Sequence, residues 1–162
     1  MAFMEIEEKF QVREESLTLA GLLSKAPISL AETIKNKSVV ILPSHGTIDA
    51  FYAGSLDILD HLNNNEIDAD IYASDEDYKE LSLHGADIWL GTFFITSVVV
   101  PIFCNVISSY IYDKLKAKNE DKISLQIIVE RKNGTTTSVN FDGKIESLDK
   151  AINAVKELDD AH

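Results

Sequence analysis

Short apolar blocks separated by polar turns fill the first half of the chain and predict alternating strands and helices. The run SVVILP at residues 38–43 is continuous, β-branched and closed by a proline, which is typical of a buried strand. Thr47 can cap a helix whose apolar positions recur at helical spacing as far as residue 62. EIDADIYA at residues 66–73 alternates as a second strand, so a β-α-β unit with parallel strands is predicted.

Three shorter segments surround this unit. Residues 4–19, MEIEEKFQVREESLTL, alternate loosely between apolar and charged positions and predict one or two strands. The segment ISLAETIKNK after Pro27 predicts a short helix. SDEDYKELSLHG at residues 74–85 predicts another helix, because Ser74 can cap it and three acidic residues follow where the helix dipole favours negative charge.

The last third of the chain predicts a hairpin followed by a helix. Apolar residues alternate through KISLQIIVE and again through TTTSVNF, and the pair Asn133-Gly134 between them predicts a tight turn of type I′. Ser147 can cap a final amphipathic helix that packs on the hairpin, since two strands alone are marginally stable. Its apolar stripe consists of Leu148, Ala151, Ile152, Val155 and Leu158.

Between these halves lies the run IWLGTFFITSVVVPIFCNVISSYIY, residues 88–112, in which no side chain is charged. Its length suffices for a membrane-spanning helix. Pro101 interrupts it, which predicts either one kinked helix or a strand followed by a helix that begins near the proline. If the run crossed a membrane, the three lysines that follow residue 113 would place its C-terminal side in the cytoplasm. The acidic first half of the chain would then have to be exported. A helix buried in the protein or between subunits is therefore preferred, and a membrane segment stays as the alternative.

A helical projection of this run separates small polar residues from a broad apolar face. Ser97, Asn105 and Ser108 fall on the polar side. The apolar side can face a core or a partner. Five of its residues are predicted to form a partner or oligomer interface: Val99, Phe103, Val106, Ile107 and Tyr110.

Together these elements predict a mixed α+β fold. It consists of a β-α-β-like N-terminal region, a long apolar helix that the proline can break, and a C-terminal β-hairpin with an amphipathic helix. The corresponding segments are 1–86, 87–118 and 119–162. At 162 residues they are expected to be parts of one compact domain.

The net charge of the chain limits the classes of partner that it can bind. Fifteen basic and 27 acidic residues give a net charge of −12, and residues 1–87 hold 17 of the acidic side chains. This field repels phosphate backbones, so no nucleic-acid partner is expected, whereas a basic protein partner is allowed. An acidic surface also serves solubility alone. The single cysteine, Cys104, fits a reducing compartment, and MAFMEIEEKF lacks a signal-peptide pattern. A cytoplasmic location is expected, with membrane association as the alternative.

Candidate chemistry centres on LPSHGTID, residues 42–49. Ser44, His45 and Thr47 stand at a predicted strand-to-helix junction, where open α/β folds place ligands and free N–H groups can hold an anion. The segment is neither a phosphate loop nor a nucleophile elbow, so no catalytic residue is assigned. No metal or cofactor is expected, because the histidines lack partners at metal-ligand spacing and the acidic run at residues 68–77 lacks the glycine of a calcium loop.

The order of parts from residue 88 to residue 158 resembles that of effector-associated constant components, small accessory proteins of bacterial conflict and anti-phage systems. The shared layout is an apolar helical segment, a basic linker, a hairpin such as ISLQIIVERKNGTTTSVNF, and a closing helix such as ESLDKAINAVKEL. The resemblance implies a non-enzymatic partner of a larger effector. It transfers no functional residue.

The leading hypothesis is a non-catalytic adaptor or assembly component that self-associates or binds a larger protein partner, in the setting of bacterial defence that the resemblance implies. One alternative is a membrane-associated accessory or effector protein anchored by residues 88–112. The other is small-ligand or anion binding, or an enzyme, at the turn formed by Ser44 and His45.

Overall fold

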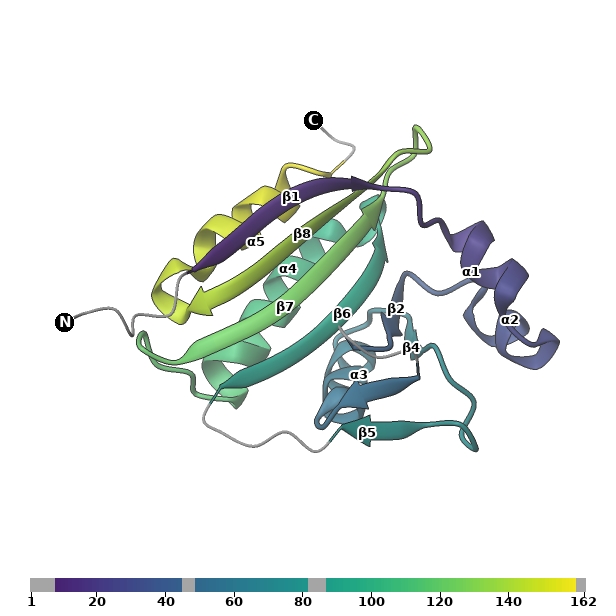
Figure 1. The fold of residues 1–162 in the computed structure, drawn as a ribbon, viewed down its shortest axis with the longest axis horizontal. Coiled ribbons are helices and arrows are strands. Elements are labelled where there is room, and N and C mark those ends of the chain that lie inside the picture. Colours follow the sequence, from purple (N-terminus) through teal and green to yellow (C-terminus); the bar gives the residue numbers. More distant parts are fainter. Residues whose placement is uncertain (1–7, 45–48, 82–86, 160–162) are drawn as a thin grey trace.

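A computed structural model describes residues 8–44, 49–81 and 87–159. A six-stranded sheet organises them, with the strands in the order β1-β8-β7-β6-β2-β4 (Figure 1). Its strands are β1 Lys9–Glu15, β2 Val39–Leu42, β4 Ala69–Ile71, β6 Ile88–Thr96, β7 Lys122–Glu130 and β8 Thr136–Lys144. A second sheet pairs β3 (Ala50–Tyr52) with β5 (Lys79–Leu81) in parallel. The predicted mixed α+β fold is confirmed.

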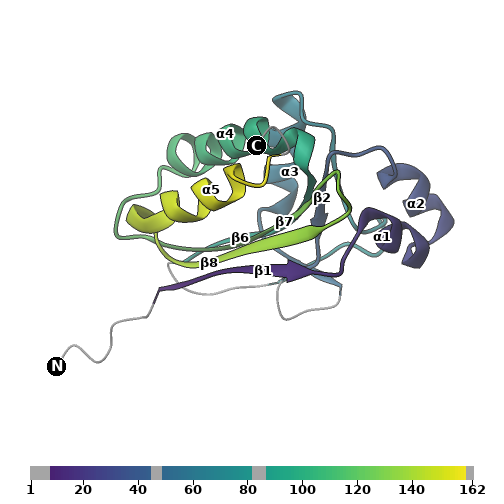
Figure 2. The same cartoon turned by 90° about the horizontal axis from the view of Figure 1, so that it is seen from above.

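Five α-helices pack on the sheet: α1 Leu19–Lys25, α2 Ile28–Ile34, α3 Ser55–Asn64, α4 Val100–Ser109 and α5 Leu148–Lys156. Figure 2 shows α3, α4 and α5 together on one side of the sheet, while α1 and α2 sit at one end of it. The large core lies beneath α3, α4 and α5. A smaller cluster packs α1 and α2 onto the opposite face, over side chains of β2, β6 and β7. One part of that opposite face therefore has no described helix over it.

The predicted β-α-β unit is present, with a different helix start. β2 and β4 are parallel neighbours, with Val39 opposite Ala69. The connecting helix α3 begins at Ser55, later than the sequence predicts, because residues 50–52 pair with β5 as a strand. Gly54 allows the turn between strand and helix, since its φ of 98° is one that glycine adopts without strain. The predicted cap Thr47 lies outside the described residues.

The C-terminal hairpin is confirmed, but its turn differs from the predicted type I′. Gly134 has a φ of 88°, whereas Asn133 keeps a negative φ. The Gly134 N–H donates to the Arg131 carbonyl at 3.0 Å, and the Arg131 N–H donates to Thr135 at 2.8 Å. This pattern is a three-residue loop with glycine at its left-handed position. The Asn133 side chain accepts a hydrogen bond from the Thr135 N–H, which favours this loop.

The uncharged run of residues 88–112 is a strand followed by a helix, which confirms the second of the two predicted alternatives, whereas the single long apolar helix is wrong. Ile88–Thr96 forms β6, a short 3₁₀ turn follows, and α4 begins at Val100 with Pro101 in its first turn. Sequence periodicity could not separate the two possibilities, because β6 is buried on both faces and shows no alternation. Within the described residues, no helix combines the length and apolar character needed to cross a bilayer.

The five predicted interface residues lie in the core of this chain. All are at most 9% exposed and pack beneath α4 against the sheet: Val99, Phe103, Val106, Ile107 and Tyr110. A partner cannot reach them while the helix stays on the sheet, so we do not retain them as an interface. On the opposite side of the helix Asn105 is exposed, as the projection predicted, whereas Ser97 is buried.

Two other local predictions need correction. Residues 79–81 form β5 where a helix was predicted, because β3 offers a parallel partner for them and Ser74 turns the chain through its bond to Asp77. Residues 19–25 form α1, a helix that was not predicted; the strand prediction ended at residue 19. The Gly21 N–H donates to Thr18 Oγ1 at 3.0 Å, so Thr18 was an available cap signal.

We predict that α4 stabilises the protein through its buried face alone. Phe103 is fully buried, with its ring centroid 5.5 Å from that of Phe93, so Phe103→Ala should lower the free energy of unfolding by about 3–5 kcal/mol. The neighbouring Ile102 is 53% exposed, and Ile102→Ala should cost less than about 1 kcal/mol. Urea unfolding measures both. Equal losses in the two variants would contradict this packing.

Candidate functional site: an open polar face of the sheet

A row of polar side chains crosses four strands on the face of the sheet opposite α4 and α5. Gln11 on β1 lies opposite Asn140 on β8, Asn140 lies opposite Gln126 on β7, and Gln126 lies opposite Thr92 on β6. Side chains of directly opposed residues point to the same face. The row therefore presents three carboxamides and one hydroxyl side by side, on strands that face the viewer in Figure 1.

A neighbouring row on the same face carries charge. Lys9 lies opposite Asp142, and Asp142 lies opposite Ser124. On the other side of the carboxamides, Arg13 lies opposite Ser138. We call this surface the polar face; its residues are Lys9, Gln11, Arg13, Thr92, Ser124, Gln126, Ser138, Asn140 and Asp142.

The polar face is open because the helices on this side cover only apolar strand positions. Farther along the strands, Phe94 and Ile128 point to this side and are covered by Leu22 of α1 and Leu30 of α2. The start of α1 is attached to the sheet, since the Leu19 N–H donates to a Glu130 carboxylate oxygen at 2.7 Å. The boundary between the covered and open parts therefore follows the change from apolar to polar side chains.

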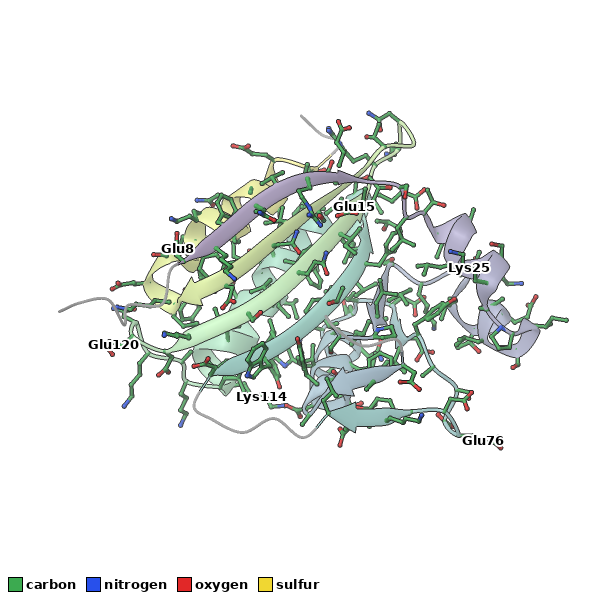
Figure 3. The ribbon with its side chains drawn as sticks, viewed as in Figure 1. Glu8, Glu15, Lys25, Glu76, Lys114 and Glu120 are labelled. Atoms are coloured by element: carbon green, nitrogen blue, oxygen red, sulfur yellow. The ribbon has the colours of Figure 1, made fainter. Side chains whose placement is uncertain are left out.

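The polar face contains a hollow of about 470 Å³. This volume lies within the usual range of sites that hold a small molecule or the side chains of a partner. Lys9, Gln11 and Arg13 line one margin, and Tyr52 and Thr92 line the other. The hollow thus extends across the sheet from β6 to the edge formed by its last strand, β1. In Figure 3, Glu8 and Glu15 mark the two ends of this edge.

Two aromatic residues form the rim beside β6. The ring centroids of Tyr52 and Trp89 are 5.5 Å apart, and the register of β6 against β7 shifts between Trp89 and Gly91. Gly91 has a φ of 143°, which a residue with a side chain rarely adopts. Burial, together with the nearby Asp142 carboxylate, raises the pKa of the Tyr52 phenol, so it stays a neutral hydroxyl at physiological pH.

The carboxamides of the polar face keep hydrogen-bonding capacity for a ligand. Asn140 donates to Ser138 Oγ at 3.2 Å, and Ser138 donates to Glu15 at 2.7 Å. Among the described residues, the side chains of Gln11 and Gln126 have no such partner. Each carboxamide offers two donor hydrogens and an acceptor oxygen. The polar face is thus suited to bind chemical groups that both donate and accept hydrogen bonds.

This arrangement supports binding more than catalysis. The hollow is lined by carboxamides, hydroxyls, one carboxylate and two cations, and its lining contains neither a histidine nor a second carboxylate. The cysteine is elsewhere: Cys104 is 1% exposed beneath α4, and burial raises the pKa of its thiol to about 11. A thiol with so high a pKa is a poor nucleophile.

The site predicted at Ser44, His45 and Thr47 is only partly described. His45 and Thr47 lie outside the described residues. Ser44 is 1% exposed, and its Oγ accepts a hydrogen bond from the Tyr52 N–H at 2.9 Å. Ser44 therefore helps to position β3, which carries Tyr52 to the rim of the hollow.

Sequence reasoning missed the polar face itself. Gln126 and Asn140 are the polar members of the alternation that predicted β7 and β8, so their common face was available as a signal. Gln11 could not be added to them, because nothing in the sequence indicates that β1 pairs with β8.

A second hollow, of about 520 Å³, is acidic. Asp49, Asp75, Glu76 and Asp77 line it, together with residues of α2 and Tyr72. Asp49 is paired with Lys79 at 2.8 Å. Glu76 lies at the far end of the molecule from Glu8 and the β1 edge (Figure 3). We call this the acidic hollow.

No protein-family model matches the chain, and no curated protein or solved structure is significantly similar to it. Among the described residues, no group of three metal-ligating side chains comes together. The geometry of the polar face is therefore the basis for a functional assignment.

We predict that Cys104 is inert while the protein is folded. With a thiol pKa of about 11, only about one molecule in a thousand carries the thiolate at pH 8, against about a quarter for an ordinary cysteine. Reaction with a chromogenic disulfide reagent should be slow in buffer and fast in guanidinium. As a control, the introduced thiol of Val98→Cys, at a position 67% exposed, should react quickly in the folded protein. Equal rates at the two positions would contradict the buried placement.

Proposed function

We propose that the protein is a non-catalytic adaptor or assembly component that binds a protein partner through the polar face. The observation that carries this proposal is the in-register row of Gln11, Asn140 and Gln126 on an uncovered part of the sheet, which ends at the buried Thr92. A side-chain carboxamide pairs well with a peptide group, because each has a donor and an acceptor. A row of them suits an extended segment or loop of another protein.

The surroundings of the row support a protein partner. Tyr, Trp and Arg are enriched in the buried centres of protein interfaces, and Tyr52, Trp89 and Arg13 border or line the face. The cations Lys9 and Arg13 are balanced by two carboxylates, Asp142 and Glu15, and Glu15 pairs with Arg13 at 3.7 Å, so the hollow and its margin have no net charge. We infer a polar partner segment without net charge.

The acidic hollow supports a second candidate, binding of a basic partner segment. Asp75, Glu76 and Asp77 follow one another along the chain there, and the net charge of the first half favours such a partner. We rank it second because its carboxylates include one held by Lys79 and one bonded to Ser74, and because acidic surfaces also serve solubility alone.

A role in bacterial conflict or anti-phage systems rests on the layout resemblance of residues 88–158 alone. The hairpin and the closing helix of that layout are present, while the apolar helix before them is the ten-residue α4 and not a long one. The proposal of partner binding through the polar face does not depend on this resemblance.

We predict that truncating the free carboxamides weakens partner binding without affecting the fold. The double variant Gln11→Ala/Gln126→Ala should recover less than about a tenth of the partner in affinity purification from the native host, because two hydrogen-bonding side chains are lost from the centre of the contact. Its thermal unfolding should match wild type, since among the described residues neither side chain bonds to another group.

Asp75→Ala/Glu76→Ala, in the acidic hollow, is the matched control. It should recover the partner as wild type does. The reverse pattern would assign binding to the acidic hollow, and equal recovery by both variants and wild type would refute both candidates.

A further inference from the structure

The outer edge of β1 is the longest uncovered strand edge of the sheet. β1 pairs with β8 over seven consecutive residues with no bulge, and no described strand lies on its other side. The opposite edge of the sheet, β4, is only three residues long. Exposed edges are usually shortened, bulged or blocked by proline, because they can pair with another chain. β4 is protected by its short length. β1, KFQVREE, is long and regular, and its protection consists of charged side chains, which disfavour partners of unmatched charge.

The side of β1 that faces the helices also has apolar residues without a covering helix. Phe10 and Val12 lie opposite Phe141 and Val139, both of which are buried under the helix layer. Yet Phe10 is 36% exposed and Val12 is 51% exposed. The helix layer therefore leaves Phe10 and Val12 partly uncovered beside an unpaired backbone edge, although α5 reaches the start of β1 through the ion pair of Lys150 with Glu8.

The charges of β1 select a second copy of the same strand as the partner. In an antiparallel pair centred on Val12, Lys9 lies opposite Glu15 of the second copy, and Gln11 lies opposite Arg13. Both Lys9–Glu15 contacts of the dimer join opposite charges, which favours the pair. Val12 meets its own copy. Phe10 lies opposite Glu14 of the second copy and diagonal to its Val12, which is within the reach of an aromatic side chain.

Neighbouring registers are less favourable. Moving the centre to Gln11 places Lys9 opposite Arg13 and Glu8 opposite Glu14, so like charges meet. Moving it to Arg13 places Arg13 opposite itself. These two alternatives shift the register by two residues and keep the faces matched. A register shift of a single residue would instead bring the polar face of one copy beside the apolar side of the other. The sequence of β1 thus fits one self-pairing better than its neighbours.

We propose that two copies of the protein form a closed dimer by antiparallel pairing of their β1 strands, centred on Val12. The contact is self-complementary, so it closes a two-fold dimer and does not continue into a filament. The two sheets become one twelve-stranded sheet, and the polar faces of the two copies become adjacent surfaces on the same side. Phe10 and Val12 of both copies form a strip between the two helix layers.

The first test is sedimentation of the purified full chain. The contact is confined to one strand from each copy, so we expect a dissociation constant in the micromolar range, with dimer predominating at about 300 μM. Val12→Arg should raise the dissociation constant at least about a hundredfold, because two cations then meet at the centre of the contact. Val98→Arg is the matched control, since Val98 is also an exposed valine, at 67%, and lies outside β1. It should sediment as wild type does.

A charge-exchange test checks the register. Lys9→Glu and Glu15→Lys each place like charges at both outer contacts, so each variant alone should dimerise about tenfold more weakly. An equal mixture of the two variants restores opposite charges at both contacts of a mixed dimer. Thermal unfolding of each variant verifies that it is folded, because Glu15 also accepts a bond from Ser138.

The results that would overturn the proposal are specific. They are a wild-type monomer at about 300 μM, equal association of Val12→Arg and Val98→Arg, or a mixture of the charge variants that associates no better than either alone. None of these measurements involves another protein, so they are independent of the proposed binding at the polar face.

Discussion

Burial of β6 on both of its faces holds the two halves of this fold together. Phe93 and Ile95 enter the large core beneath the helix layer, whereas Phe94 packs against α1 and α2 on the other side. β6 is parallel to β7 and antiparallel to β2, so it joins the C-terminal hairpin to the β2–β4 pair. The carboxamide row depends on the same strand, because Thr92 of β6 completes it and the bulge before Gly91 places Trp89 at its rim.

The double burial of β6 also explains which parts of the fold were accessible to sequence reasoning. β7, β8 and α5 each bury one face, so their periodicity identified them. β6 has apolar residues at consecutive positions, and neither strand nor helix periodicity can be read from such a run. Pro101 did mark the region where the helix begins. The local signals in residues 74–81 favoured a helix, but residues 79–81 form a strand because they pair with β3, which lies about 30 residues earlier in the chain.

The candidate site needed information that a single sequence does not carry. Strand alternation places Gln126 and Asn140 on the polar sides of their strands, and the hairpin register sets them side by side. Whether that side meets water or a helix depends on where α1 and α2 pack, and the participation of Gln11 depends on a pairing between residues 129 positions apart. The strand-to-helix junction at Ser44 attracted attention because the helix was expected directly after it, whereas β3 intervenes.

The place of β1 in the sheet has a consequence for biosynthesis. Lys9 pairs with Asp142, so a strand translated early has no partner within its own chain until most of the polypeptide has been made. Contacts between such distant residues form late, because the intervening chain must first be closed into a loop. During this delay β1 of a nascent chain exposes both of its edges. Neighbouring ribosomes on one messenger hold such strands close together, so two nascent chains can pair through β1 before either has made its own β8.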